Sequence, residues 1–166
     1  MHGGHNRGTH AALALVRPEG EPGVSFCSHC GERPREVRRS RVCEACGFGL
    51  LLECAADVAP SPGQPFVVLD SSMAVCAVSA SAETLLATTE TDAVNRHVTE
   101  LLVPADAEAD GEHNLAVAVT WAARGEGEAR KVFVRPANTF GVRLSAQVTS
   151  CGPPRAALLV FDAPHR

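Results

Sequence analysis

Two pairs of cysteines near the start of the chain constrain its fold more than any other feature. Cys27 and Cys30 form the first pair and Cys43 and Cys46 the second, each with two residues between its members. A glycine follows each pair, and glycine accepts the left-handed backbone that a tight turn around a metal requires. Four thiolates in two such turns are the ligand set of a closed tetrahedral metal site. We therefore predict a metal site with these four cysteines as ligands.

The metal expected at this site is zinc in a structural role, as in a zinc ribbon. Four thiolates suit a redox-inert ion and leave no coordination position for a substrate. A rubredoxin-like iron site is the alternative, and a protein with such a site would carry electrons. A redox-active Cys-x-x-Cys motif fits this sequence less well than a metal site does. Such motifs occur singly beside a βαβ pattern, which this sequence lacks. A segment of this length buries too little surface to fold alone, so the metal must supply the missing stability.

The connector between the two pairs is rich in arginine. From residue 27 to residue 46, five arginines stand against three glutamates, which gives 5 − 3 = +2. This charge balances the formal charge of a four-thiolate zinc centre, or it contacts phosphates. No aromatic residue lies among the arginines, so base stacking is not indicated and charge balance is the favoured interpretation. The five residues are Arg33, Arg35, Arg38, Arg39 and Arg41.

The composition gives little indication that the protein binds a membrane or a nucleic acid. The formal net charge is −4, and no apolar run approaches the roughly 18 residues of a membrane span. The apolar stretch at residues 11–16 is too short for a signal peptide. Seven cysteines, four of them in two close pairs, fit a reducing compartment better than a disulfide framework. We expect a cytoplasmic protein.

The chain divides into four parts by composition. Residues 1–22, rich in His and Gly, are expected to be a flexible tail, and residues 23–58 a zinc-ribbon-like module. Residues 59–65 contain three prolines and a glycine, which exclude a helix or a central strand and indicate a linker. Residues 66–163 are expected to form one folded domain. Within the module, the segment after Leu51 fits the closing strand of the ribbon or a short helix, and the helix is favoured.

The last of these parts has the pattern of a compact α+β domain. Alternating or continuous apolar runs indicate strands, and apolar residues at helical spacing indicate helices. A serine at 79 or 81 is expected to cap the first helix. The expected strands are 66–70, 74–78, 131–135, 142–148 and 156–161, the expected helices are 82–87, 91–102 and 113–124, and residues 106–111 are expected to form an acidic loop.

Three stretches of this domain carry a resemblance to a known family. They are Phe66-Val67-Val68-Leu69-Asp70, then Val78 to Leu86, and then Val94 to Pro104. The first is similar to a PAS strand that ends in an acidic residue, the second to the entry into the first PAS helix, and the third to the segment before the long connecting helix. Residues 65–163 therefore resemble a PAS domain. The resemblance implies a five-stranded antiparallel sheet with flanking helices, used to sense a ligand or to dimerise.

The cofactor positions of the family do not match in this sequence. Flavin-binding PAS domains carry a cysteine in an Asn-Cys-Arg segment, and the similar segment here reads Asn95-Arg96-His97. Haem-binding members take a histidine from the long helix or nearby. His97 and His113 are the residues near that place, and a surface or capping role is favoured for both. No cofactor-binding residue is assigned, and the PAS ligand stays unknown or absent.

The three remaining cysteines are expected to be small apolar residues that pack in the interior. They are Cys54, close to the metal module, Cys76, in an expected strand, and Cys151, just after the end of another. Free cysteine is among the most buried residue types, which favours this interpretation.

No catalytic motif appears in the sequence, so we expect a non-catalytic protein. Ser-His-Asp, phosphate-loop and His-Glu-x-x-His patterns are all missing. The expected function is regulatory, in signal transduction or control of transcription, with the zinc module as output and residues 50–58 as coupler. The expected partners are a second copy of the chain, bound through the PAS-like domain, and a signalling or transcription protein. Nucleic acid is weakly supported. The alternatives are the iron electron carrier and a pure protein-interaction scaffold.

Overall fold

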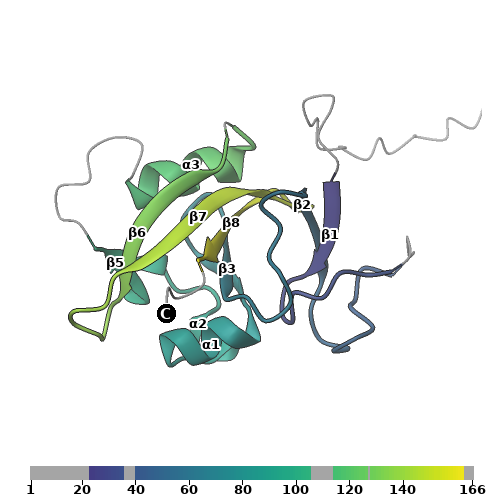
Figure 1. The fold of residues 1–166 in the computed structure, drawn as a ribbon, viewed down its shortest axis with the longest axis horizontal. Coiled ribbons are helices and arrows are strands. Elements are labelled where there is room, and N and C mark those ends of the chain that lie inside the picture. The colour runs from purple at the N-terminus through teal and green to yellow at the C-terminus, as the bar shows by residue number, and fades with distance from the viewer. Residues whose placement is uncertain (1–22, 36–39, 106–113, 127, 163–166) are drawn as a thin grey trace, which may run out of the picture.

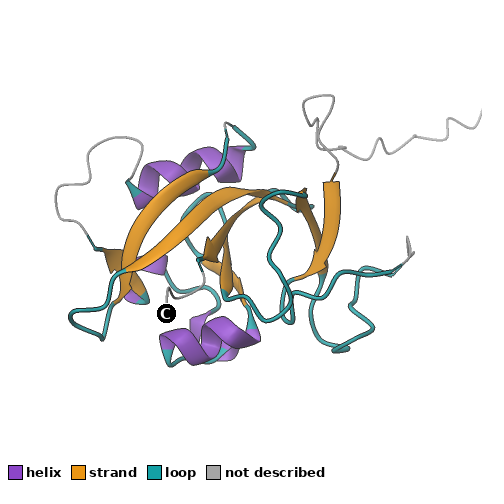
Figure 2. Ribbon diagram, in the orientation of Figure 1, coloured by secondary structure: helices purple, strands orange, loops and turns teal. Residues whose placement is uncertain are grey.

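The computed structural model describes residues 23–35, 40–105, 114–126 and 128–162. Within them a two-stranded hairpin lies beside a six-stranded antiparallel sheet that carries the helices (Figures 1 and 2). In order along the chain the elements are β1 Gly23–Cys27, β2 Leu51–Ala55, β3 Phe66–Leu69, β4 Val75–Val78, α1 Ala80–Leu86, α2 Glu90–Ala93, the 3-10 helix η1 Val98–Glu100, β5 Leu102–Pro104, α3 Leu115–Arg124, β6 Arg130–Pro136, β7 Leu144–Cys151 and β8 Ala156–Phe161.

The strand order in the larger sheet is β4-β3-β8-β7-β6-β5, and every neighbouring pair is antiparallel. The first strand of the domain therefore pairs with the last, β3 with β8, in the middle of the sheet. The predicted α+β class is confirmed, with an antiparallel sheet and flanking helices. The sheet has one strand more than the five predicted, because residues 102–104 pair with the end of β6.

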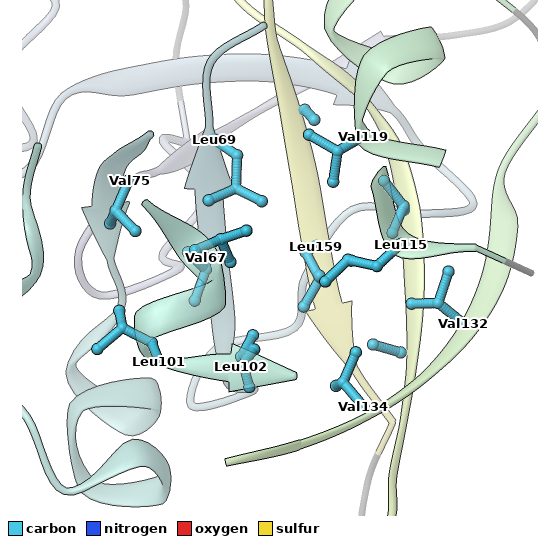
Figure 3. Close-up of a cluster of buried hydrophobic side chains, with 14 of the residues drawn as sticks. Val67, Leu69, Val75, Leu101, Leu102, Leu115, Val119, Val132, Val134 and Leu159 are labelled. Carbon is cyan, nitrogen blue, oxygen red and sulfur yellow. The ribbon is translucent and has the colours of Figure 1, made fainter. Parts of the chain in front are cut away.

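One hydrophobic cluster lies between the sheet and the helices. It takes Val67 and Leu69 from β3, Leu159 from β8, and Leu115 and Val119 from α3, as Figure 3 shows. Helices α1 and α2 contribute to the same cluster. Because successive side chains of a strand point to opposite faces, these residues cover only the face of β3 and β8 that lies toward the helices.

A second cluster lies on the opposite face of the same strands, under the hairpin. Phe66 and Val68 of β3 and Leu158 of β8 pack there against Phe26 of β1 and Leu52 of β2. The rings of Phe26 and Phe66 meet edge to face, with their centroids 5.6 Å apart. Every residue of β3 and of β8 is therefore buried. Burial on both faces explains why these two strands have continuous rather than alternating apolar sequences.

The single helix predicted over residues 91–102 is wrong. Helix α2 ends at Ala93, and Asn95 then adopts a positive φ of 69°, which asparagine tolerates better than most residues. The backbone at residues 95 and 96 hydrogen-bonds to Val75 of β4 instead of continuing the helix. Pairing with the edge strand replaces the helical hydrogen bonds, and this tertiary contact is not visible in the local sequence.

The helix favoured after Leu51 is also wrong, and the alternative of a closing strand is correct. Strand β2 pairs antiparallel with β1 through five residue pairs, from Gly23 with Ala55 to Cys27 with Leu51. Leu52 and Cys54 are buried and Glu53 between them is exposed, which is the alternation of a strand with one covered face.

The remaining predictions differ from the structure mainly at element ends. Ser79 caps α1, and Asn114 caps α3. The strand predicted from residue 142 begins at Leu144. The tail 1–22, the acidic loop 106–111 and His113 lie outside the described residues. Among the described residues, no helix has the length and apolar character that crossing a membrane requires.

The two clusters predict that the hairpin and the sheet unfold together. Phe26→Ala removes a fully buried ring and is expected to lower the free energy of unfolding by about 3–5 kcal/mol. Trp121, the only tryptophan, lies on α3 and reports on the far side of the sheet. Denaturant titration followed by Trp121 fluorescence and by far-UV circular dichroism should give one shared transition that Phe26→Ala moves.

Phe48→Ala is the matched control, because this ring is 66% exposed and its loss should cost under about 1 kcal/mol. A Phe26→Ala protein whose Trp121 transition matches that of the wild type would show that the hairpin and the sheet unfold independently.

Candidate metal centre

The four predicted ligands come together at one end of the hairpin. Their sulfur atoms all lie within 4.8 Å of one another, with Cys27 and Cys46 3.6 Å apart and Cys30 and Cys43 3.8 Å apart. A tetrahedral zinc with Zn–S bonds of about 2.3 Å places its sulfurs about 3.8 Å apart. The donor set and its spacing therefore fit a tetrahedral, thiolate-bound metal ion.

The two cysteine turns have the same backbone design. In each, the glycine after the second cysteine donates its N–H to the carbonyl of the first cysteine: Gly31 to Cys27 at 3.0 Å and Gly47 to Cys43 at 2.8 Å. Both glycines have a positive φ, of 73° and 66°. The left-handed backbone predicted from the sequence is thus present in both turns, and it presents both sulfurs of each pair to one point.

Backbone N–H groups surround the sulfurs. His29 and Cys30 donate to Cys27 Sγ at 3.4 and 3.5 Å, and Gly49 donates to Cys46 Sγ at 3.4 Å. Such bonds favour the ionised sulfur. The N–H groups orient the sulfurs in the manner of outer-shell partners of a metal site.

Burial and hydrogen bonding act on these thiols in opposite directions. Burial raises the pKa of the Cys27 thiol far above its usual value and raises that of Cys30 as well. Burial also acts to raise the pKa of Cys46, but hydrogen bonds from Gly49, Phe48 and neighbouring sulfurs outweigh it and lower that pKa to about 6. A divalent cation bound by these four residues would supply the charge that allows all four sulfurs to be thiolates together.

Gly49 is a functional position that the sequence reasoning missed. A Cβ at this position would lie 2.3 Å from Cys27 Sγ and 2.8 Å from the nitrogen of His29, so no side chain fits. The nitrogen of Cys43 also donates to the Gly49 carbonyl at 2.8 Å. The second glycine of the Cys-Gly-Phe-Gly segment was the available sign, since glycine often marks a close approach of backbone to a ligand.

The first cysteine turn contacts the helices of the PAS-like domain directly. The carbonyl of His29 accepts a hydrogen bond at 2.9 Å from the N–H of Ala80, the first residue of α1. Nδ1 of His29 lies 3.4 Å from a carboxylate oxygen of Glu90, the first residue of α2. The His29 ring also meets the Phe48 ring edge to face at 4.8 Å. A single residue between two of the four clustered cysteines therefore touches two helices.

The hairpin joins the large sheet through its backbone as well. Glu53 and Gly152 exchange two hydrogen bonds, of 2.6 and 3.0 Å, so β2 continues the pairing beyond the end of β7. From the connector, Arg41 donates to the Pro153 carbonyl and Arg33 donates to the Ala59 carbonyl. These two of the five predicted arginines therefore bind protein carbonyls, while Arg38 and Arg39 lie outside the described residues.

A groove of about 640 Å³ lies where the hairpin meets the sheet. On one side it is lined by Phe48, which is mostly exposed, and by Leu50, which is half exposed. On the other side it is lined by Cys76 of β4 and by Val94, which follows α2. The volume is within the range of small-molecule sites. The lining of this groove therefore comes from both the hairpin that carries the four cysteines and the larger sheet.

The remaining cysteines behave differently from one another. Cys54 and Cys151 are buried in the cluster under the hairpin, as predicted. The prediction that Cys76 packs in the interior is wrong, because this residue is exposed. Val68 pairs with Ala77 and Leu69 pairs with Val75, so Cys76 is the extra residue of a β-bulge. The bulge turns its side chain away from the core at the edge of the sheet.

His97 has the surface and capping role that was expected for it. His97 is exposed and caps η1, with its side chain accepting from the N–H of Thr99. The segment from Asn95 to His97 connects α2 to η1, and its residues are all exposed.

Comparison with known proteins gives a likeness of fold. The chain is similar to the PAS domain of nitrogen regulation protein NR(II) from Vibrio parahaemolyticus, with 15% identity and a TM-score of 0.44 over 60% of this chain and 88% of that one. It is also similar to the PAS domain of an HTR-like protein from Haloarcula marismortui, with 19% identity and a TM-score of 0.43 over 60% of this chain and 84% of that one. No family model and no curated protein matches the sequence.

The close approach at Gly49 gives a sharp test of the site. Gly49→Ala places a methyl group against Cys27 Sγ and displaces the N–H that bonds Cys46. We expect metal affinity to fall roughly 10- to 100-fold, the usual loss when an outer-shell partner of a metal ligand is removed. Competition with a chromophoric chelator measures this affinity.

Gly63→Ala is the matched control. Gly63 also has a positive φ, of 78°, but a Cβ there meets nothing within 4 Å. This variant should lose about 1–2 kcal/mol of stability from backbone strain and keep its metal affinity. Equal metal affinities for the two variants would contradict the assigned role of Gly49.

Proposed function

We propose that this chain is a non-catalytic regulatory protein in which a structural zinc hairpin and a PAS-like domain work as one unit. The processes in which we place it are signal transduction and regulation of transcription. The observation that carries the proposal is the position of His29. It lies between two metal ligands, its carbonyl receives the first N–H of α1, and its ring faces the Glu90 carboxylate of α2.

A structural role for zinc follows from the number of ligands. Four sulfurs complete a tetrahedral shell, so the ion has no position for water or substrate. The metal therefore contributes to folding rather than to chemistry. The short hairpin depends on this contribution, because its own described core is limited to residues such as Phe26 and Leu52.

The same geometry supports communication between the two modules. Release of the metal frees the first cysteine turn, which loosens the contacts of His29 with α1 and α2. Conversely, a ligand or partner that moves α1 or α2 acts on the turn that holds Cys27 and Cys30. By linkage, each event must change the free energy of the other by the same amount.

Metal content is the first measurement that tests the proposal. The purified wild-type chain should contain one zinc ion per chain, and Cys43→Ser should contain none. Cys76→Ser is the matched control, because Cys76 is exposed and lies outside the four-sulfur cluster. Metal stoichiometry that Cys43→Ser leaves unchanged would refute the ligand assignment.

Metal removal tests the coupling. A strong chelator should lower the unfolding midpoint reported by Trp121, although this residue lies on α3 and not in the hairpin. Glu90→Gln keeps the size of the side chain but removes the charge that faces His29, and it should reduce this effect of the chelator. A Trp121 transition that is the same with and without metal would show that the modules are independent.

The alternatives make different predictions for the same sample. An iron electron carrier would absorb visible light when freshly purified, whereas zinc is colourless. A pure scaffold would show neither an added ligand mass nor a changed assembly state in native mass spectrometry after incubation with lysate. The same spectrum gives the oligomeric state, and a homodimer is expected.

The arginines of the connector between the two cysteine pairs could bind a second kind of partner, a nucleic acid. If Arg33, Arg35 and Arg41 contact phosphates, duplex DNA should bind at low ionic strength with an affinity that falls steeply as salt is added. An absence of binding in that titration would remove nucleic acid as a partner of the connector.

A further inference from the structure

Two cysteines outside the metal centre lie opposite each other where the hairpin joins the larger sheet. Glu53 of β2 and Gly152, the residue after β7, exchange two backbone hydrogen bonds and form an antiparallel bridge (Figure 1). In an antiparallel ladder, the residue after one partner lies opposite the residue before the other. The register at this junction therefore places Cys54 opposite Cys151.

The kind of pair decides how close these two residues are. Glu53 and Gly152 are a hydrogen-bonded pair, so the next pair along the ladder is a non-hydrogen-bonded one. In such a pair the Cα atoms are about 4.5 Å apart and the side chains approach each other closely. A disulfide requires Cα atoms roughly 4.4–6.8 Å apart. Cys54 and Cys151 are therefore at a separation that a disulfide can span.

Both side chains also point to the same side of the junction. Cys54 and Cys151 belong to the cluster under the hairpin, and they are 2% and 3% exposed. Glu53, between the buried Leu52 and Cys54, is exposed on the opposite side of β2. The two sulfurs thus share one covered space between β2 and the end of β7.

We propose that Cys54 and Cys151 form a reversible disulfide when the protein meets a peroxide. The bond joins β2 covalently to the end of β7, so it fixes the four-cysteine hairpin on the larger sheet. In a reducing compartment, disulfides are transient and serve catalysis or redox sensing. The pair is therefore a redox-sensitive lock between the two parts of the chain.

Hydrogen peroxide supplies the oxidising equivalents for this bond. The thiolate of one cysteine attacks a peroxide oxygen, the O–O bond breaks, and the hydroxide that leaves takes up the thiol proton as water. The second thiolate then attacks the sulfur of the resulting sulfenic acid. The S–S bond forms, the S–O bond breaks, and a second water leaves. Two thiols lose two electrons in total, and one peroxide is reduced to two waters.

Burial makes the response depend on local opening of the junction. Burial raises the pKa of the Cys151 thiol far above its usual value, and the nearby Cys54 thiol raises it further. The thiolate is the reactive form, so little of it is present while the hairpin is docked. Peroxide reaches the pair when the edge of the hairpin opens, and the bond closes as the strands pair again.

This inference goes beyond the proposed function, because it uses neither the four clustered cysteines nor the contacts of His29. Metal content and chelator sensitivity therefore test one proposal, and mapping of the cross-link tests the other.

The experiment treats the full, zinc-loaded Cys76→Ser chain with a small excess of hydrogen peroxide. The remaining thiols are alkylated in denaturant, and the chain is digested with a protease that cleaves after glutamate. In this variant, residues 54–83 form a fragment with Cys54 as its only cysteine, and residues 129–166 form one with Cys151 as its only cysteine. We expect mass spectrometry to find these two fragments joined, and a dithiol reductant to separate them.

The same bond should raise the stability of the oxidised chain. It closes a loop of roughly 100 residues, and long loops gain most from closure. The oxidised chain should unfold at a higher denaturant concentration, as Trp121 reports, and reductant should restore the original midpoint. Cys54→Ala and Cys151→Ala, which keep an apolar side chain in the cluster, should lose both the cross-link and this shift. The fragment map requires neither variant, so it decides the question even if one of them fails to fold.

Three results would overturn the proposal. In the first, both fragments are recovered separately and fully alkylated after peroxide treatment. In the second, peroxide cross-links the four clustered cysteines and leaves Cys54 and Cys151 alkylated, which would make the metal centre the redox-sensitive site. In the third, the two fragments are joined only in a covalent dimer on a non-reducing gel, so that the bond connects two copies of the chain.

Discussion

The structure depends on two adjacent strands, β3 and β8, that are buried on both faces. Val67 and Leu159 hold the helices on one side, while Phe66 and Leu158 hold the metal-binding hairpin on the other. Because the same two backbones form the floor of both clusters, neither side can shift without moving residues that the other side packs against. This shared floor joins a metal site and a PAS-like domain in a chain of 166 residues.

The metal centre adds directional contacts to this apolar packing. His29 connects the turn that carries Cys27 and Cys30 to the starts of α1 and α2, through one hydrogen bond to α1 and the 3.4 Å approach of its ring to the Glu90 carboxylate. Apolar packing alone tolerates small displacements, whereas hydrogen bonds of this kind fix position and angle. The arrangement places the four-cysteine cluster in direct contact with helices that lie beyond the hairpin.

The sequence predicts the features that are encoded locally. The clustering of Cys27, Cys30, Cys43 and Cys46 follows from their spacing, and the strands follow from their apolar patterns. Predictions failed where a distant contact decides the local structure. The backbone at Asn95 pairs with β4 instead of continuing a helix, and a bulge in the pairing of β4 turns Cys76 outward. The role of Gly49 depends on the distance to Cys27 Sγ, which spacing alone does not reveal.

The docking of the hairpin also has a consequence for synthesis on the ribosome. Phe26 and Leu52 emerge early, but Leu158 of β8, against which they pack, is added more than 100 residues later. During this interval the apolar underside of the hairpin has no β8 to cover it, while all four cysteines have already been made. A metal ion that these four cysteines capture would therefore order the hairpin before its last packing partner has been made.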